Sequence, residues 1–290
     1  MMPELPEVET MRTSLLPYCN RVINKVVINN PNLRKKVNDN FIADISNNYI
    51  TNIERLGKFL LFSLSNQKYL LMHAGMSGKF IIENLVKDTF AKNYSNLQLS
   101  SSTNNTLYKH NHIILTLEDG TNISFNDPRR FGLALTFNSR ALATQNLKLG
   151  IDALSSELTI QYLTKLLQKS TSDIKTFLLN QQAIAGIGNI YASEILFYSK
   201  IHPLTVSKTL SASQIKLLLK YIKEVLTKAV KLGGSTLKDY QKPNGEIGYF
   251  QTTFAVYNKD MQKCSSCGNL ITKITQKGRS TYLCPKEQIL

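Results

Sequence analysis

The sequence predicts an α+β protein of several domains, because three stretches of its 290 residues carry different patterns. Residues 1–135 read as one helix followed by runs rich in β-branched and aromatic residues, as strands are. In residues 136–250, the apolar side chains recur with the spacing of helices. Residues 251–290 hold three of the four cysteines. Stretches of this size are typical of two compact domains with a small appended module.

The first stretch begins with a predicted helix. Leu5, Val8 and Met11 follow one helical stripe, and Pro17 ends it. Strand-like runs follow at residues 21–30, 50–63, 69–82, 112–117 and 122–126. Residues 118–121 read Glu-Asp-Gly-Thr and predict a hairpin turn between the last two runs. Residues 83–109, rich in Asn, Ser and Lys, predict an exposed insertion.

The second stretch predicts helices at residues 158–167, 174–181, 189–200 and 213–232. The last of these places Ile215, Leu218 and Ile222 on one face, while lysines cover the other. Residues 233–250 contain Gly, Pro and Asn and therefore predict a loop.

The charge balance indicates a polyanionic partner. Lys and Arg number 35 against 20 Asp and Glu, a net charge of +15, and nucleic acid is the first candidate. Charge alone is a weak argument, because many of these lysines would also suit an ordinary solvated surface.

The chain carries no pattern of secretion or of a membrane span. Its first residues are acidic where a signal peptide is basic, and no apolar run approaches the ~20 residues that a membrane helix needs. We therefore expect a soluble cytoplasmic protein. In such a chain, a C-x-x-C pair favours metal binding over a disulfide. Cys19, far from the others, reads as a small buried apolar residue.

Four motifs carry the chemistry. They read PELPEVE at residues 3–9, DPRRFG at 127–132, AGIGNIYA at 185–192, and C-x2-C-x16-C at 264–284 with GRST at 278–281. Taken singly, the first is an acidic helix start and the second a turn with a structural Arg pair. Two glycines before a helix allow backbone N–H groups to approach a phosphate, although a tight packing turn is the ordinary alternative.

Together, in this order and spacing, the motifs resemble the formamidopyrimidine-DNA glycosylase family from residue 3 to 288, apart from residues 83–109. The resemblance implies an N-terminal helix plus β-sandwich domain, a helical helix-two-turns-helix domain, and a C-terminal zinc-finger-type β-hairpin. It implies a monomeric DNA glycosylase and AP lyase in base excision repair. Its substrate would be double-stranded DNA containing oxidised purines, such as 8-oxoguanine and formamidopyrimidines.

The resemblance also implies the catalytic residues. The nucleophile is the secondary amine of Pro3, which forms a Schiff base with the sugar C1′ and leads to β,δ-elimination. An α-amine titrates near pH ~8, so a neutral fraction exists at neutral pH. Glu4 matches the acid–base residue, and Lys58 and Arg279 match phosphate contacts at the active site. A proline inside a peptide bond has no nucleophilic amine, so we expect translation from Met2 and trimming to Pro3.

An extruded base leaves a void that the protein must fill. Met76, Arg129 and Phe131 match the family's three void-filling side chains, of which Arg can hydrogen-bond the orphaned base. The resemblance gives Tyr191 and Glu194 supporting roles and makes 233–250 the loop that closes over the lesion, with Thr236 and Tyr240 as candidate contacts. The other DNA-binding residues that it implies are His73, His112, Arg130 and Asn189.

The finger departs from the family at its last ligand. Cys264, Cys267 and Cys284 match, whereas Glu287 stands where the family has a fourth cysteine. Zinc accepts carboxylate oxygen, so the expected cofactor is one zinc ion held by these four residues. Three cysteines completed by water, or a finger without metal, are the alternatives.

Two other functions stay open. The sister group that removes oxidised pyrimidines usually starts Pro-Glu-Gly-Pro-Glu, and Leu5 in place of that glycine favours the oxidised-purine branch. The other is a DNA-binding module without activity, such as a zinc-ribbon regulator or a decayed enzyme, which the altered finger leaves open.

Overall fold

The computed structural model describes residues 2–84, 109–235 and 249–290, which fall into two compact units. The described part of the first unit is residues 2–3, 7–84 and 109–147, and that of the second is residues 4–6, 148–235 and 249–290. Nearly all of the predicted insertion, and most of the predicted lesion loop with Thr236 and Tyr240, lie outside the described residues.

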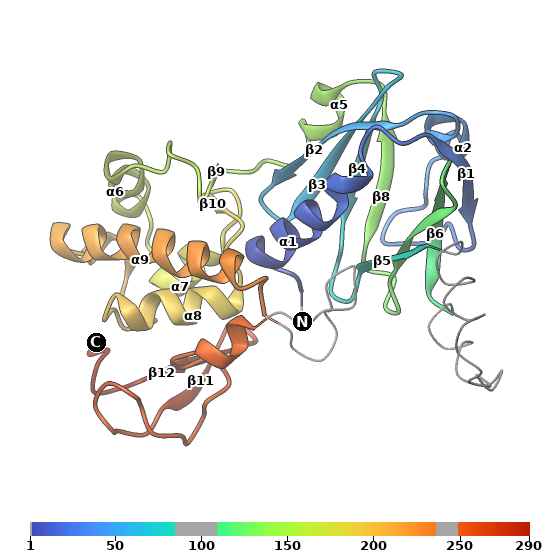
Figure 1. The fold of residues 1–290 in the computed structure, drawn as a ribbon. Coiled ribbons are helices and arrows are strands. Elements are labelled where there is room, and N and C mark those ends of the chain that lie inside the picture. Colours follow the sequence, from blue (N-terminus) through green and yellow to red (C-terminus); the bar gives the residue numbers. More distant parts are fainter. Residues whose placement is uncertain (1, 85–108, 236–248) are drawn as a thin grey trace, which may run out of the picture. The chain divides into compact units, whose positions relative to one another are not determined.

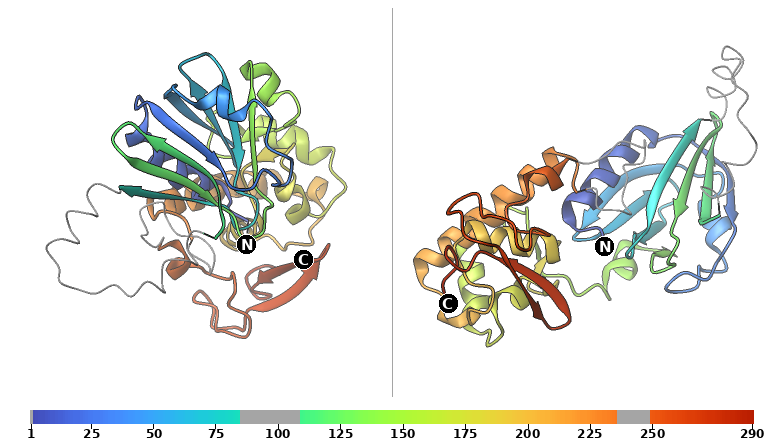
Figure 2. Two further views of the ribbon diagram at one scale, coloured as in Figure 1. Left: turned by 90° about the vertical axis from the view of Figure 1, so that its right-hand side faces the viewer. Right: turned by 90° about the horizontal axis from the view of Figure 1, so that it is seen from below.

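The first unit is a β-sandwich of two four-stranded antiparallel sheets, as predicted (Figures 1 and 2). One sheet has the order β1-β6-β7-β5 and the other β2-β3-β4-β8. The main apolar core takes side chains from both sheets and from the helix α1, whose Val8, Met11 and Leu15 are buried in it. The elements are α1 (Leu5–Leu15), η1 (Leu16–Tyr18), β1 (Ile23–Ile28), α2 (Phe41–Ile45), β2 (Ile50–Leu56), β3 (Phe59–Leu64), β4 (Tyr69–His73), β5 (Lys79–Asn84), β6 (Asn111–Leu117), β7 (Thr121–Asn126), β8 (Leu133–Phe137) and α5 (Arg140–Thr144).

Two predicted strands are each two strands in the structure. The run 50–63 turns back at Gly57 (φ 59°), so that Leu56 pairs with Phe59 across a two-residue hairpin. The run 69–82 breaks into β4 and β5 around Gly75 (φ 63°). A continuous apolar pattern hides such breaks, because strands on both sides of a turn bury the same kinds of side chain. The hairpin at 118–121 is confirmed, with Gly120 at φ 79° between β6 and β7.

The second unit is mainly helical, and in it α8 and α9 run side by side (Figure 1). Ser211 and Gln214 form a capping box that starts α9, and the predicted apolar face of this helix is buried. The elements are β9 (Ile151–Asp152), α6 (Ile160–Gln168), α7 (Ile174–Leu179), β10 (Ile184–Ala185), α8 (Asn189–Tyr198), η2 (Ser207–Thr209), α9 (Ala212–Lys231), η3 (Phe250–Thr253), β11 (Thr272–Gln276) and β12 (Arg279–Leu283).

The cysteine-bearing module ends in the hairpin β11–β12. Gln276 pairs with Arg279 across a two-residue turn, Lys277 and Gly278, in which both φ angles are positive. The module packs around a small apolar core that includes its Tyr282 and Ile271 and also Phe197 of α8. None of the helices in the described ranges is long and apolar enough to cross a membrane.

Candidate functional site

The N-terminus of α8 holds a buried carboxylate. Glu4 is 2% exposed, and its Oε1 and Oε2 accept the backbone N–H groups of Ile190 (2.9 Å) and Tyr191 (3.3 Å). These first-turn N–H groups have no partner within the helix, and the helix dipole favours an anion beside them. The glycine turn that had suggested a phosphate site therefore presents its helix terminus to Glu4.

The two glycines of this turn make room for the N-terminal segment. A Cβ on Gly188 would lie 2.2 Å from the Glu4 carboxyl carbon, and one on Gly186 would lie 2.6 Å from Leu5 Cδ1. Gly186 also has φ 106°, and its carbonyl accepts the N–H of Leu5 at 3.0 Å. This close packing fixes Glu4, and Glu4 is the chain neighbour of the buried Pro3.

The hairpin that carries Arg279 is anchored by a lysine that the sequence analysis did not single out. Lys175 of α7 donates from Nζ to the Ser280 carbonyl (3.0 Å) and to Thr281 Oγ1 (2.6 Å). Asn189 Nδ2 donates to the same Ser280 carbonyl at 2.9 Å. The available signal was a lysine within the apolar pattern of residues 174–181.

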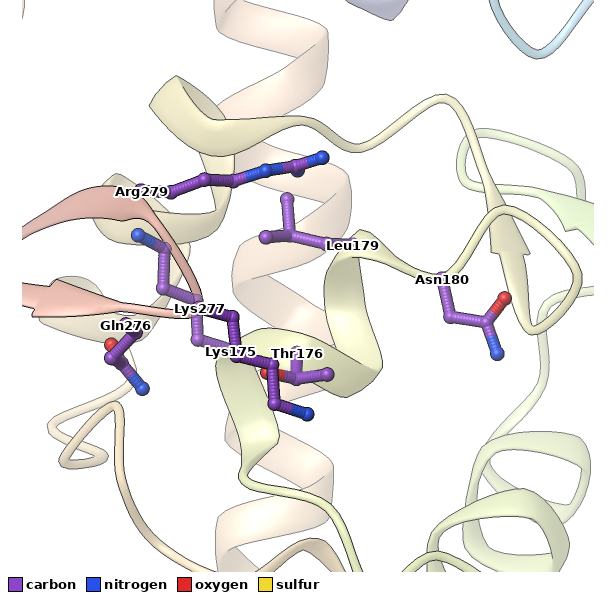
Figure 3. Close-up of a pocket in the computed structure, with 7 residues that line it drawn as sticks. All are labelled: Lys175, Thr176, Leu179, Asn180, Gln276, Lys277 and Arg279. Atoms are coloured by element: carbon purple, nitrogen blue, oxygen red, sulfur yellow. The ribbon is translucent and has the colours of Figure 1, made fainter.

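Burial lowers the pKa of Lys175 to about 8, and the Arg279 charge acts in the same direction while Glu4 opposes it. A pocket of about 300 Å³ lies beside this lysine (Figure 3). Arg279 and Lys277 from the hairpin give it further positive charge, and Arg279 is exposed. Such a group of cations suits phosphate oxygens. The lining residues are Lys175, Thr176, Leu179, Asn180, Gln276, Lys277 and Arg279.

In the first unit, Lys58 and His73 lie near each other. Lys58 stands in the β2–β3 turn directly before β3, and His73 ends β4, where it pairs in register with Phe59. His73 Nδ1 accepts the N–H of Gly75 at 2.9 Å, so the neutral ring carries its proton on Nε2. Burial, followed by the charges of Lys58 and Arg34, lowers the pKa of His73 to about 4. His73 is therefore neutral at physiological pH.

The three predicted void-filling residues lie on two loops of the first unit. Met76 is half-buried in the loop of residues 74–78, and Arg129 and Phe131 are exposed in the loop of residues 127–132, as is Arg130. The Arg129 guanidinium lies 4.9 Å from the centre of the Phe131 ring. Phe131 is 46% exposed, so it is not a core residue.

His112 is predicted to contact DNA, and the structure places its ring against the 127–132 loop. Its side chain is buried, and its Nε2 lies 2.8 Å from the main-chain carbonyl of Asp127. One ring nitrogen therefore supports the 127–132 loop, and a direct contact of His112 with DNA stays a prediction.

Three cysteines of the finger form a metal-binding group. The sulfur atoms of Cys264, Cys267 and Cys284 all lie within 4.8 Å of one another. Backbone N–H groups of Ser266 and Cys267 point at the Cys264 sulfur, and those of residues 286 and 287 point at the Cys284 sulfur. Three sulfur atoms gathered in this way, two of them supported by backbone donors, fit a zinc ion.

Glu287 is not a member of this group. Its Oε2 instead lies 3.2 Å from Lys200 Nζ, and its role as the fourth ligand stays a prediction. The following residue, Gln288, is fully buried; its Oε1 accepts the N–H of Cys284 (3.0 Å) and its Nε2 donates to the Ile201 carbonyl (2.9 Å). Gln288 therefore holds the backbone of Cys284 in place. No local pattern in the sequence indicates this role.

Glu194 supports the start of the finger module from within α8. Its carboxylate is fully buried and accepts the backbone N–H groups of residues 255, 256 and 257 at 2.7–3.0 Å. Burial raises the pKa of Glu194, and the three N–H donors oppose that rise. Tyr191, also fully buried, packs its ring against Phe250.

The predicted site residues thus fall into two groups, one in each unit. Those of the first unit are Pro3, Lys58, His73, Met76, His112, Arg129, Arg130 and Phe131. Those of the second unit are Glu4, Asn189, Arg279 and the finger residues.

Family models match three parts of the chain. They are the formamidopyrimidine-DNA glycosylase N-terminal domain over residues 2–134, the H2TH domain of the same family over residues 149–241, and the zinc finger found in FPG and IleRS over residues 262–286.

Whole-chain relatives carry the same family name. The formamidopyrimidine-DNA glycosylases of Wolbachia pipientis subsp. Culex pipiens and of Rickettsia africae are 40% and 38% identical to the chain, and each match covers 98% of both sequences. The MutM (FPG) protein of Thermus thermophilus is 34% identical with a TM-score of 0.82, covering 99% of this chain and 98% of that one. The Lactococcus lactis Fpg bound to abasic-site DNA is 31% identical with a TM-score of 0.84, covering 99% of this chain and 100% of that one. On its sequence, its fold and its motifs, the chain belongs to the formamidopyrimidine-DNA glycosylase family.

Proposed function

We propose that the protein is a bifunctional DNA glycosylase and AP lyase that excises oxidised purines from double-stranded DNA, with the amine of Pro3 as nucleophile. The observation that carries the proposal is the placement of Glu4. This carboxylate follows Pro3 in the chain, is buried, and is held by two N–H groups of α8. A fixed carboxylate beside a secondary amine can move a proton at the carbon that the amine attacks.

In the proposed reaction, the Pro3 amine attacks C1′ while the C1′–N bond breaks and the base leaves with the electron pair and a proton. Glu4 donates a proton to O4′ as the sugar ring opens, which leaves an iminium between Pro3 and C1′. The iminium acidifies the C2′–H bond. Loss of that proton expels the 3′ phosphate, a second elimination expels the 5′ phosphate, and hydrolysis frees the amine.

Cationic and polar residues of each unit are proposed to hold the DNA backbone. Lys58 and Arg130 in the first unit, with Asn189 and Arg279 in the second, would contact phosphates. Binding should then weaken with salt by about 0.9 log units per log unit of salt for each phosphate neutralised. We expect Arg279→Ala to lose incision far more than non-specific DNA binding, and equal incision by variant and wild type would contradict the assignment.

Met76, Arg129 and Phe131 are proposed to fill the void left by the extruded base. An exposed aromatic ring with a guanidinium over it can restore stacking and offer a hydrogen-bond donor to the orphaned base. His73, with its proton on Nε2, is proposed to donate to a phosphate.

The finger is proposed to bind one zinc ion through Cys264, Cys267 and Cys284, and the ion would hold the hairpin that carries Arg279. All four cysteines are free thiols, which suits the reducing cytoplasm, where we propose that the protein acts as a monomer. We also propose that residues 1–135, 136–250 and 251–290 act as the catalytic, DNA-binding and finger segments.

Borohydride trapping tests the proposed nucleophile. Protein that begins at Pro3, as verified by intact mass, should form a covalent adduct with duplex DNA containing 8-oxoguanine opposite C. The matched control is the form that retains Met1 and Met2, which should bind the duplex without an adduct because its Pro3 nitrogen is an amide. Trapping by that form would identify another amine, and Lys58→Met would test the first suspect.

The same assay separates the other functions. A preference for thymine glycol over 8-oxoguanine would indicate the oxidised-pyrimidine group. Binding without any adduct or strand cleavage by the trimmed protein would indicate a DNA-binding module.

A further inference from the structure

One buried carboxylate joins the two loops that carry the proposed void-filling residues. Asp127 is 0% exposed, and its Oδ1 accepts the hydroxyl of Ser77, which belongs to the Met76 loop, at 2.5 Å. Its Oδ2 accepts the N–H of Gly132, at the far end of its own loop, at 2.7 Å. The carboxylate therefore closes the 127–132 loop and ties it to the 74–78 loop.

Further hydrogen bonds complete this connection. Ser77 Oγ also accepts the N–H of Arg129 at 3.1 Å, so this one hydroxyl makes two hydrogen bonds to the 127–132 loop. The Asp127 carbonyl accepts the N–H of Arg130 at 3.1 Å and lies 2.8 Å from His112 Nε2. Both side-chain oxygens and the main-chain carbonyl of this fully buried residue have partners, as a buried charge requires.

The two loops also touch backbone to backbone. A Cβ on Gly75 would lie 2.3 Å from the carbonyl carbon of Phe131 and 2.5 Å from the Gly132 nitrogen. A Cβ on Gly132 would lie 2.9 Å from Asp127 Oδ2. No side chain fits at either glycine. Because the backbones of the two loops can therefore lie close together, the Asp127 carboxylate reaches both loops.

We propose that Asp127 and Ser77 are positioning residues that hold the two loops as one rigid body, so that Met76, Arg129 and Phe131 enter the base stack together. This inference rests on the proposed function. Extruding a base costs a few kcal/mol of unstacking, and side chains offset that cost best when they are already ordered before binding. Two independent loops would each lose conformational freedom on entering the DNA, whereas the linked pair has lost it on folding.

The test compares Ser77→Ala, which removes the link between the loops, with Ser77→Thr, which retains the hydroxyl. Ser65→Ala is the matched control, because Ser65 also donates a side-chain hydrogen bond, to Asn48 Oδ1 at 3.0 Å, but takes no part in either loop. Asp127→Asn is the second variant, which keeps the shape of the side chain but only one oxygen. All are made in the full chain that begins at Pro3.

Single-turnover excision is measured on two duplexes, one with the lesion opposite C and one with the lesion opposite a one-nucleotide gap, where extrusion is easier. Ser77→Ala removes the hydrogen bond to the Asp127 carboxylate. Because such a bond contributes about 1.5 kcal/mol, we expect excision from the paired duplex to be about tenfold slower. On the gapped duplex we expect a much smaller defect. Ser77→Thr should recover the rate, and Ser65→Ala should match wild type on both duplexes.

A 2-aminopurine beside an abasic-site analogue reports whether the void is filled, and we expect its fluorescence in the Ser77→Ala complex to differ from wild type. Wild-type rates for both Ser77→Ala and Asp127→Asn would overturn the proposal, as would equal losses on the two duplexes, which would indicate general damage to the fold. A wild-type protein inactive on both duplexes would instead overturn the proposed function itself.

Discussion

Acid should destabilise the first unit through His73. The ring is 8% exposed, and its Nδ1 accepts the N–H of Gly75. Burial first, and then the charges of Lys58 and Arg34, lower the pKa of His73 from 6.5 to about 4. Between these two values the unfolded chain binds a proton that the folded protein does not, so stability falls as the pH falls. The full window corresponds to about 3 kcal/mol of unfolding free energy.

The perturbation is His73→Asn, whose side-chain oxygen can accept the Gly75 N–H without titrating in this range. The unfolding free energy of both proteins is measured in urea at about pH 7 and about pH 4.5. The difference between the two proteins isolates the contribution of His73, because their other titratable groups are the same. We expect wild type to lose about 2 kcal/mol more than the variant. The ring resonances of His73 should show a titration midpoint near 4. Identical pH dependence in the two proteins, or a midpoint near 6.5, would refute the reasoning.

Four further substitutions test other parts of the site. Phe131→Ala should change the unfolding free energy by less than ~1 kcal/mol, because the ring is half exposed, yet slow excision from duplex DNA about tenfold; a collapse in thermal stability would make it a core residue. Glu287→Ala should retain one zinc ion per chain, as measured by metal analysis, because its carboxylate pairs with Lys200. Cys284→Ala should lose the ion, and equal loss in both variants would restore Glu287 as a ligand. Lys175→Met removes two hydrogen bonds to the Arg279 hairpin, so incision should fall about tenfold at unchanged zinc content; unchanged incision would contradict the anchoring role.

Local pattern alone was enough for the longer helices and the motifs, but it missed the short helices α2 and α5. The predicted helix at 213–232 is α9 at Ala212–Lys231, because its apolar spacing and its capping box act within a few residues of each other. The pair Cys264 and Cys267 is also a local pattern, whereas Cys284 was added by the resemblance to the family, and the structure brings the three sulfur atoms together. The same patterns missed the turns at Gly57 and Gly75, where apolar runs continue through a change of direction.

The sequence by itself determined the family, the order of its segments and the residue types of the candidate site. Only the tertiary structure decided how those residues are held. Glu4 meets the N–H of Ile190 across 186 residues, Lys175 meets Ser280 across 105, and Ser77 meets Asp127 across 50. It also decided that Glu287 pairs with Lys200 rather than joining the cysteines. The physical reason is that buried polar groups take partners wherever packing brings them together. A local sequence pattern does not encode which distant residues the fold brings into contact.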